Sequence, residues 1–270
     1  MKRIATDYHL HTSYSNDGTH GMEEMIAGAI EAGMEEIVFT DHMDFINGEP
    51  WPEEFDCAGS AAEFRKLQQL YGDRIIMMLG IEIGLGPGFN HIADRAAQEA
   101  GYTFVIGSTH ALEGADIGYE PHRYFPGKTK AEAYNIYLEA MLENVRSSRM
   151  SNVFGHLDYV ERYGSYEDNL FYVGEHAELL DEILRSIVSL GKGLELNTSG
   201  FRYGLERPHP YADILRRYRE LGGEIITVGS DAHRPWHVAF AFDRAREILI
   251  ETGFTAYTLY RDGQPVWRDL

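Results

Sequence analysis

The chain has 270 residues, of which 44% are hydrophobic and 12% aromatic, and its formal net charge is −19 at pH 7. This composition is too apolar for a disordered or low-complexity protein, and the strong acidity argues against a nucleic-acid or anionic-membrane partner. The single cysteine excludes an internal disulfide and a thiolate zinc site.

The amino-terminal segment lacks an apolar run of signal-peptide length, and no stretch approaches the roughly 18 apolar residues of a membrane span. We therefore expect a soluble, cytoplasmic protein.

Short apolar runs alternate with amphipathic segments along the chain. The runs expected to form buried strands are 4–10, 36–40, 75–83, 103–108, 152–155, 193–197 and 224–229. Helical patterns lie near 21–33, 57–71, 89–100, 130–149, 172–190, 209–222 and 237–251, and several end at a glycine. Strand–helix units in series predict an α/β fold with a parallel sheet, at this length a closed or nearly closed (β/α)7 barrel, with a doubly wound open sheet as the alternative.

The remaining segments add detail to this plan. The tail from Phe254 to Trp267 predicts an extra strand and a turn at Asp262-Gly263. The connections 43–56 and 111–129 are long and rich in aromatic residues, glycine and proline, so they form either lids and pocket walls or plain surface excursions. Because no repeat or linker interrupts the pattern, we expect one domain over residues 1–270.

Side chains that bind metals gather at the ends of the predicted strands. His9 and His11 end the first strand and point to one side of it, because side chains alternate along a strand. Asp7 shares that face and is a candidate to orient an imidazole. Asp17 follows in a turn. Other predicted strands end in, or contain near their carboxyl ends, His42, Glu82, His110, His156, Asp231 and His233. In a parallel barrel these ends converge on the face that carries the active site.

The candidate ligands are His9, His11, Asp17, His42, Glu82, His110, His156, Asp231 and His233. They are too many for one ion and suit two or three divalent metals with a bridging carboxylate. A set of imidazoles and carboxylates without thiolate favours zinc, manganese or iron. Such centres activate water and hold the oxygens of a transferred phosphoryl group.

These motifs resemble those of the PHP (polymerase and histidinol phosphatase) superfamily, in the same order and at the same strand positions over essentially the whole chain. The resemblance is carried by the HxH pair with Asp17, TDH ending at His42, GIE with Glu82, SxH ending at His110, GH ending at His156, and DAH from Asp231 to His233. The segments 155–163 and 195–202, and the stretch from His110 through Tyr124 to Tyr134, resemble the histidinol-phosphatase branch.

The resemblance implies a distorted seven-stranded (β/α) barrel with three divalent ions. One ion would bind His9, His11, Glu82 and Asp231, a second Glu82, His110 and His156, and a third Asp17, His42 and His233. Arg162 matches a phosphate-binding arginine of this branch. Further candidate substrate contacts are Asn197, Arg202 and His209. The residues expected to take part in catalysis are Glu82, Asp231, His233 and Arg162.

The function implied is that of a metal-dependent phosphomonoester hydrolase with a small phosphorylated substrate. The most specific form is a histidinol-phosphatase of histidine biosynthesis, which converts L-histidinol phosphate and water to L-histidinol and phosphate. A hydroxide bridging two metals would attack phosphorus, while Arg162 and the metals hold the other phosphate oxygens.

Three alternatives stay open. The first is a PHP phosphoesterase that acts on nucleotides or another small phosphate ester. The second is a metal-dependent amidohydrolase, against which the lack of a lysine at a strand end counts. The third is a non-catalytic metal-binding module, against which the complete ligand set counts.

Overall fold

The computed structural model describes residues 3–270. Its central strands are β1 (Thr6–Leu10), β2 (Glu36–Phe39), β3 (His42–Ile46), β5 (Ile76–Leu79), β6 (Ile81–Gly84), β7 (Val105–Ser108), β10 (Val153–Phe154), β11 (Gly193–Asn197) and β12 (Ile226–Gly229). The long helices are α1 (Met22–Glu31), α2 (Cys57–Tyr71), α3 (Asn90–Ala100), α5 (Lys130–Ser147), α6 (Ala177–Ser189), α8 (Ala212–Glu220) and α9 (Phe242–Glu251). Each predicted helical pattern contains one of these helices.

The central strands form two sheets. One has the order β1-β2-β5, and the other is seven-stranded, with the order β12-β11-β10-β7-β6-β3-β4. Within them only β4 (Glu49–Trp51) pairs antiparallel, with β3. The predicted strand 75–83 contributes to both sheets, because it contains β5 and β6, whereas 36–40 contains only β2 and is followed by β3 of the other sheet. The α/β class with parallel strands is therefore confirmed, while a single continuous ladder is not seen.

The first and last central strands lie side by side. The N–H of His11, just after β1, donates to the carbonyl of Ala232, just after β12, at 2.9 Å, and the Ala232 N–H donates to the carbonyl of His9 at 3.3 Å. The edge strand β1 of the three-stranded sheet is thus linked to the edge strand β12 of the seven-stranded sheet at their carboxyl ends.

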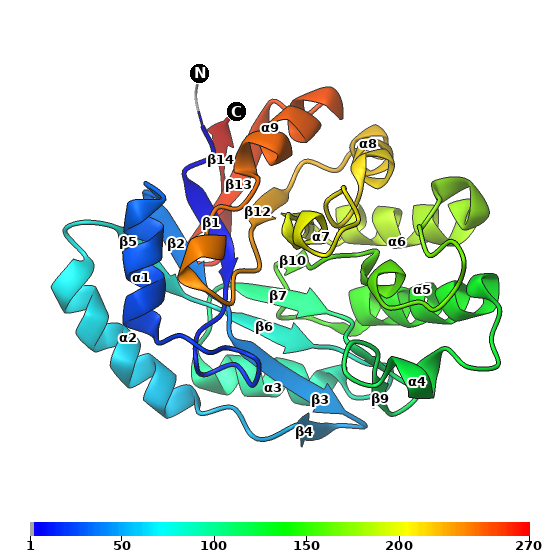
Figure 1. The fold of residues 1–270 in the computed structure, drawn as a ribbon, viewed down its shortest axis with the longest axis horizontal. Helices are drawn as coiled ribbons and strands as arrows, with labels where there is room; N and C mark the ends of the chain where they lie inside the picture. Colours follow the sequence, from blue (N-terminus) through cyan, green and yellow to red (C-terminus); the bar gives the residue numbers. More distant parts are fainter. Residues whose placement is uncertain (1–2) are drawn as a thin grey trace.

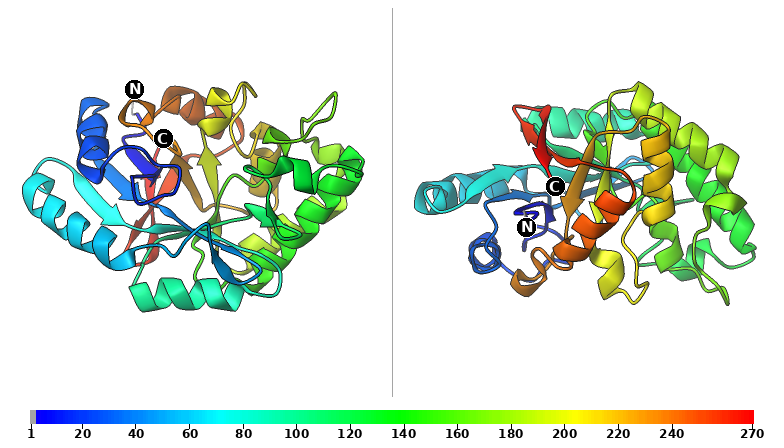
Figure 2. Two further views of the ribbon diagram at one scale, coloured as in Figure 1. Left: turned by 60° about the horizontal axis from the view of Figure 1, so that its bottom comes forward. Right: turned by 90° about the horizontal axis from the view of Figure 1, so that it is seen from above.

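The long helices cover the outside of the strands, with α1 and α2 on one side and α5, α6 and α8 on the other (Figures 1 and 2). Each helix turns an apolar stripe inward: in α6, Leu180, Ile183, Leu184 and Ile187 are buried at helical spacing. The strands, covered by helices, are apolar at most positions, and every residue of β2, β6, β7, β11 and β12 is buried. Polar side chains inside this layer therefore need partners.

Both long connections contain short elements. The first holds the β3–β4 hairpin, and the second holds β8 (Ala111–Leu112), β9 (Ala115–Asp116) and α4 (Pro121–Tyr124). Single turns of helix occur at η1 (Tyr159–Arg162), η2 (Val173–Glu175), α7 (Ser199–Arg202) and η3 (Pro235–His237).

The carboxyl-terminal tail forms a hairpin of β13 (Ala256–Arg261) and β14 (Gln264–Asp269). Arg261 pairs with Gln264, so Asp262 and Gly263 form a two-residue turn, and both have positive φ, at 50° and 74°. Asp-Gly favours this kind of turn, and the predicted strand and turn are confirmed. Within residues 3–270, none of the helices combines the length and the apolar character that a bilayer span requires.

Candidate active site

The structure brings the nine predicted ligands together in one cluster at the carboxyl ends of the strands. Three ligands lie on strands: His9 on β1, His42 on β3 and Glu82 on β6. The others follow strands: His11 and Asp17 come after β1, His110 after β7, His156 after β10, and Asp231 and His233 after β12. Distances of 2.9 to 3.9 Å between imidazole nitrogens and carboxylate oxygens connect all nine.

Glu82 lies at the centre of this cluster and is 1% exposed. Its Oε1 is 2.9 Å from Nε2 of His156 and 3.3 Å from Nε2 of His110, and its Oε2 is 3.2 Å from Nε2 of His9 and 3.0 Å from Nδ1 of His42. Burial alone would raise the pKa of this carboxyl, but the surrounding imidazoles hold it well below its usual value. Glu82 is therefore a carboxylate that several neighbouring sites can share.

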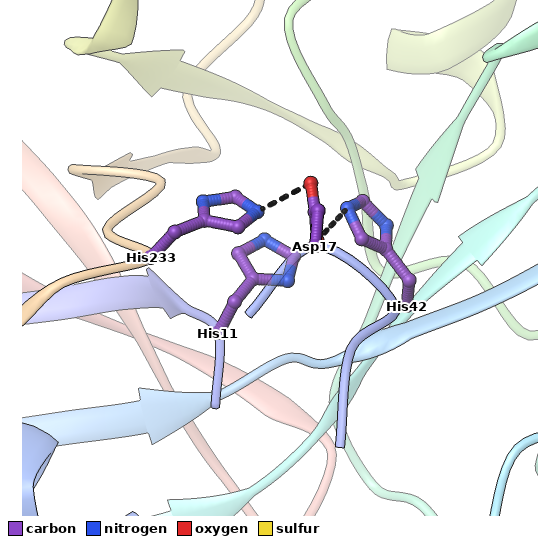
Figure 3. Close-up of side chains that lie close together, drawn as sticks. All are labelled: His11, Asp17, His42 and His233. Atoms are coloured by element: carbon purple, nitrogen blue, oxygen red, sulfur yellow. Dashed lines mark ion pairs between the residues drawn. The ribbon is translucent and has the colours of Figure 1, made fainter. Parts of the chain in front are cut away.

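A second group lies next to it and consists of His11, Asp17, His42 and His233 (Figure 3). Asp17 places Oδ2 3.0 Å from Nε2 of His233 and Oδ1 3.7 Å from Nε2 of His42. The rings of His11 and His233 are stacked at a centroid distance of 4.0 Å. Four side chains from three separate parts of the chain thus direct donor atoms at one point.

The donor atoms of the cluster fit divalent cations. Buried atoms without a hydrogen-bond partner among residues 3–270 include Nε2 of His9, His11 and His233, Nδ1 of His42 and Oε2 of Glu82. Buried polar atoms in folded proteins almost always have a partner, because an unpaired one costs about 1–3 kcal/mol. Imidazole nitrogens and carboxylate oxygens that converge in this way are the usual ligands of zinc and related metals.

The local geometry also groups the ligands. Donor atoms within 4.8 Å of one another define the sets His9/His11/Asp231, His42/Glu82/His110 and His11/Asp17/His42/His233. These sets overlap with the three ion sites implied by the resemblance but place His42 beside Glu82 and His110, and His11 beside Asp17.

Two site residues have strained backbones. His156 has φ of +22° and Asp231 has φ of +54°, a region that residues other than glycine rarely occupy. Such strain costs on the order of 1–3 kcal/mol per residue and concentrates at functional sites. Both conformations turn a ligand side chain at the end of a strand into the cluster.

Sequence reasoning missed the carboxylates that orient the ligand histidines. Glu195, in the middle of β11, accepts a hydrogen bond from Nδ1 of His9 at 2.5 Å, and Asp44 accepts one from Nδ1 of His110 at 3.0 Å. With Nδ1 protonated, each ring presents Nε2 to the cluster, which is how carboxylates commonly prepare histidine for metal binding. The signal for Glu195 was a charged residue within an otherwise apolar buried strand.

The expectation that Asp7 orients an imidazole is wrong. Its carboxylate instead accepts hydrogen bonds from the backbone N–H groups of Ser230 and Ala239, both at 2.9 Å, and from the Ser230 hydroxyl. Asp7 shares a face with His9 but lies at the start of β1, beside the segment that follows β12. It therefore fixes the loop that carries Asp231 and His233.

Arg162 lies at the end of η1, beside the cluster. Its Nη2 donates to the Ser199 hydroxyl at 2.6 Å, and that hydroxyl lies 3.0 Å from Oδ2 of Asp231. The guanidinium is 4.0 Å from the ring centroid of Tyr203 and 5.0 Å from that of Tyr159. Aromatic faces hold a guanidinium in place by cation–π attraction, so the cation is fixed next to the ligands.

The candidate substrate contacts Asn197 and Arg202 lie close to Asp231. Asn197 is fully buried, and its amide donates to Oε2 of Glu195 at 3.1 Å and to Oδ2 of Asp231 at 3.3 Å. Arg202 donates to the carbonyls of Ser230 and Asp231 at 2.6 and 2.7 Å. These contacts support the strained Asp231 loop, and a role in binding substrate stays a prediction.

His209, the other candidate contact, is fully buried. Its Nδ1 lies 2.6 Å from Oδ1 of Asp158, and its Nε2 has no hydrogen-bond partner among the described residues. Burial and the nearby Arg162 lower its pKa well below the usual value, so the ring is neutral at pH 7.

The match to a known protein family covers most of these ligands. The model of the PHP domain family matches residues 7–199, a segment that contains seven of the nine predicted ligands. The chain belongs to the PHP family. Its relatives include the histidinol-phosphatase of Lactococcus lactis, with 35% identity over 94% of this chain and 93% of the relative. The histidinol-phosphatase of Saccharomyces cerevisiae is 21% identical over 93% of this chain and 91% of the relative.

A crystal structure of the Lactococcus lactis histidinol phosphate phosphatase, complexed with zinc, L-histidinol and phosphate, superposes with a TM-score of 0.88 at 32% identity. It covers 97% of this chain and 99% of that one. These matches place this PHP chain in the histidinol-phosphatase branch, as the motifs predict.

Proposed function

We propose that the chain is a metal-dependent histidinol-phosphatase, which hydrolyses L-histidinol phosphate to L-histidinol and phosphate in histidine biosynthesis. The observation that carries the proposal is the convergence of nine imidazole and carboxylate side chains beside a fixed arginine. The similarity to the Lactococcus lactis enzyme, whose crystals contain zinc, L-histidinol and phosphate, supports it.

The ligand set would hold up to three divalent ions, zinc, manganese or iron, in the groups built around Asp231, Glu82 and Asp17. Bound there, such ions would supply a water nucleophile at neutral pH and neutralise charge on the phosphoryl oxygens. Glu82 is placed to be shared between two of these groups. His233 and Asp231 present donor atoms on neighbouring sides of the cluster.

Arg162 would bind a phosphate oxygen. Its guanidinium is fixed by the Tyr203 ring and the Ser199 hydroxyl, so little rotational freedom is lost when a phosphate arrives. A planar guanidinium can form two parallel hydrogen bonds to a phosphoryl group. Arg162 would therefore position the substrate and offset the charge that develops in the transition state.

The seven strand–helix units would form the distorted barrel expected from the sequence, as one domain over 1–270. The hydrogen bonds between His9, His11 and Ala232 support closure, because they join β1 to the end of β12. The cytoplasmic location stays a prediction.

A phosphate-release assay with zinc or manganese tests the function. The substrates are L-histidinol phosphate, a set of mononucleotides and p-nitrophenyl phosphate. We expect kcat/KM to be highest for L-histidinol phosphate, by at least about 100-fold, because a site built for a polar substrate discriminates strongly against analogues. A preference for a mononucleotide would instead support the alternative PHP phosphoesterase.

A further inference from the structure

A cavity of about 210 Å3 lies beside the ligand cluster. Asp17, His42 and His110 form one part of its wall. The other part contains Asp116 at the end of β9 and a group of tyrosines that includes Tyr159. The proposed chemistry at the phosphate uses the first part of the wall and the tyrosines that hold Arg162, but it assigns no role to Asp116.

Asp116 is a buried carboxylate without an ion pair among the described residues. It is 3% exposed, and its Oδ1 accepts hydrogen bonds from the backbone N–H groups of Gly118 and Tyr119, both at 2.8 Å. Within residues 3–270 no lysine, arginine or histidine forms an ion pair with it, and its Oδ2 has no hydrogen bond. Burial raises the pKa of this carboxyl, and the nearby His110 and the backbone hydrogen bonds offset that effect only in part.

The remaining wall suits a small cation. The Tyr159 hydroxyl donates to that of Tyr163 at 3.1 Å, and both rings line the cavity. Gly118 permits Tyr159 and Asp116 to pack closely against the backbone, since a Cβ at this position would lie 2.7 Å from the Tyr159 hydroxyl oxygen and 3.2 Å from Oδ1 of Asp116. The hydroxyl oxygens of these tyrosines can accept hydrogen bonds from an ammonium group beside the carboxylate that would pair with it.

We propose that Asp116 binds the ammonium group of the substrate, so that the site selects phosphate monoesters of amino alcohols. The phosphate would occupy the ligand cluster, and the ammonium group would lie against Oδ2 of Asp116 in the same cavity. L-Histidinol phosphate has this chemistry, because its ammonium group is on the carbon next to the one that carries the phosphate. The inference rests on the proposed function and extends it to substrate selection.

The variant Asp116→Asn removes the negative charge of the side chain without disturbing the loop. The asparagine keeps an oxygen that can accept from the N–H groups of Gly118 and Tyr119, so the loop after β9 is retained while the negative charge is lost. Glu120→Gln is the matched control, because it removes a carboxylate four residues away that pairs with Arg123 on the surface.

Two kinetic measurements test the inference, with L-histidinol phosphate and with p-nitrophenyl phosphate, which has no cation. We expect Asp116→Asn to raise KM for L-histidinol phosphate about 10- to 100-fold, the usual effect of losing a charged hydrogen bond, and to leave kcat/KM for p-nitrophenyl phosphate unchanged. Glu120→Gln should alter neither. An equal loss for both substrates would overturn the inference but leave the proposed function in place, whereas no hydrolysis of L-histidinol phosphate by the metal-loaded wild type would overturn both.

Binding of the product identifies the group that Asp116 contacts. Calorimetry compares L-histidinol with its analogue in which hydrogen replaces the amino group, in the wild type and in Asp116→Asn. We expect the substitution to weaken L-histidinol binding at least about tenfold and to leave binding of the analogue unchanged. Equal weakening of both ligands would assign Asp116 to the imidazole and contradict the inference.

Discussion

Glu195 contacts two of the ligand residues, His9 and His156. It is fully buried, and besides His9 it accepts a hydrogen bond from the backbone N–H of His156 at 3.2 Å. We expect Glu195→Gln to lower metal affinity about 10- to 100-fold, because the glutamine is a weaker acceptor and no longer fixes the His9 ring. Metal content after dialysis against a series of chelator concentrations measures this directly.

The control for Glu195 is Glu182→Gln, which removes an exposed carboxylate that pairs with Arg146 on the surface. It should retain metal as the wild type does. If Glu195→Gln also retained wild-type metal content at every chelator concentration, Glu195 would not orient His9 for metal binding.

Arg162 is expected to act on the phosphate. Replacing it with alanine should raise KM for L-histidinol phosphate about 10- to 100-fold and also lower kcat, since a charged hydrogen bond contributes about 1.5–3 kcal/mol. Arg162→Lys should lie between, because lysine keeps the charge but not the planar donor pair. The inhibition constant of inorganic phosphate gives a second readout, and an unchanged KM and inhibition constant would remove Arg162 from the phosphate site.

At the residue scale, the ligands could be predicted because each is a histidine or carboxylate at the end of an apolar run, and the pattern recurs along the chain. The partners of the ligands could not be predicted. Glu195 and His9 are 186 positions apart, so their contact depends on which strands lie side by side. The same holds for Asp116, whose unpaired charge becomes visible only when its surroundings are known.

Among the elements, the hairpin β13–β14 is linked to the sheet by an ion pair between the exposed Arg261 and the buried Glu36. Nη1 of Arg261 donates to Oε1 of Glu36 on β2 at 2.7 Å, and its Nη2 donates to Oε2. Glu36 is 1% exposed and also accepts from the Tyr8 hydroxyl at 2.5 Å. Removal of the arginine would leave a buried carboxylate without a cation.

We therefore expect Arg261→Ala to lower the free energy of unfolding by about 2 kcal/mol, less than for a fully buried pair because Arg261 is partly screened by water, measured by urea denaturation. Arg268→Ala on the same hairpin is the comparison, because Arg268 pairs with the exposed Glu35 at 3.0 Å. An exposed pair contributes less than about 1 kcal/mol. Equal losses in the two variants would show that burial of Glu36 does not set the strength of this contact.

The first and last residues of a helix were predictable where capping and periodicity determine them. α2 begins and ends at the predicted residues 57 and 71. The pattern 209–222 becomes helical only at Ala212, because His209 forms backbone hydrogen bonds with Asn197 at 2.7 and 2.8 Å. The division of the predicted strand 75–83 between two sheets also depends on pairing partners, which no local pattern in the sequence reveals.

For the whole molecule, the α/β order was predictable because strands and helices alternate regularly and a glycine follows several helices. The net charge of −19 belongs to the whole chain, and a molecule of that charge repels long polyanions. The clustered donors at the carboxyl ends would reverse this field locally when cations bind. A compact phosphate ester could then enter a site from which an extended polyanion is excluded.

The central claim is that the nine converging side chains form a metal centre that hydrolyses L-histidinol phosphate. Its most direct test is the rate of phosphate release from L-histidinol phosphate before chelation, after exhaustive chelation and dialysis, and after zinc or manganese is added back, with metal content determined each time. We predict that activity disappears with the metal and returns when metal is restored. Full activity in protein from which the metal has been removed would contradict the claim.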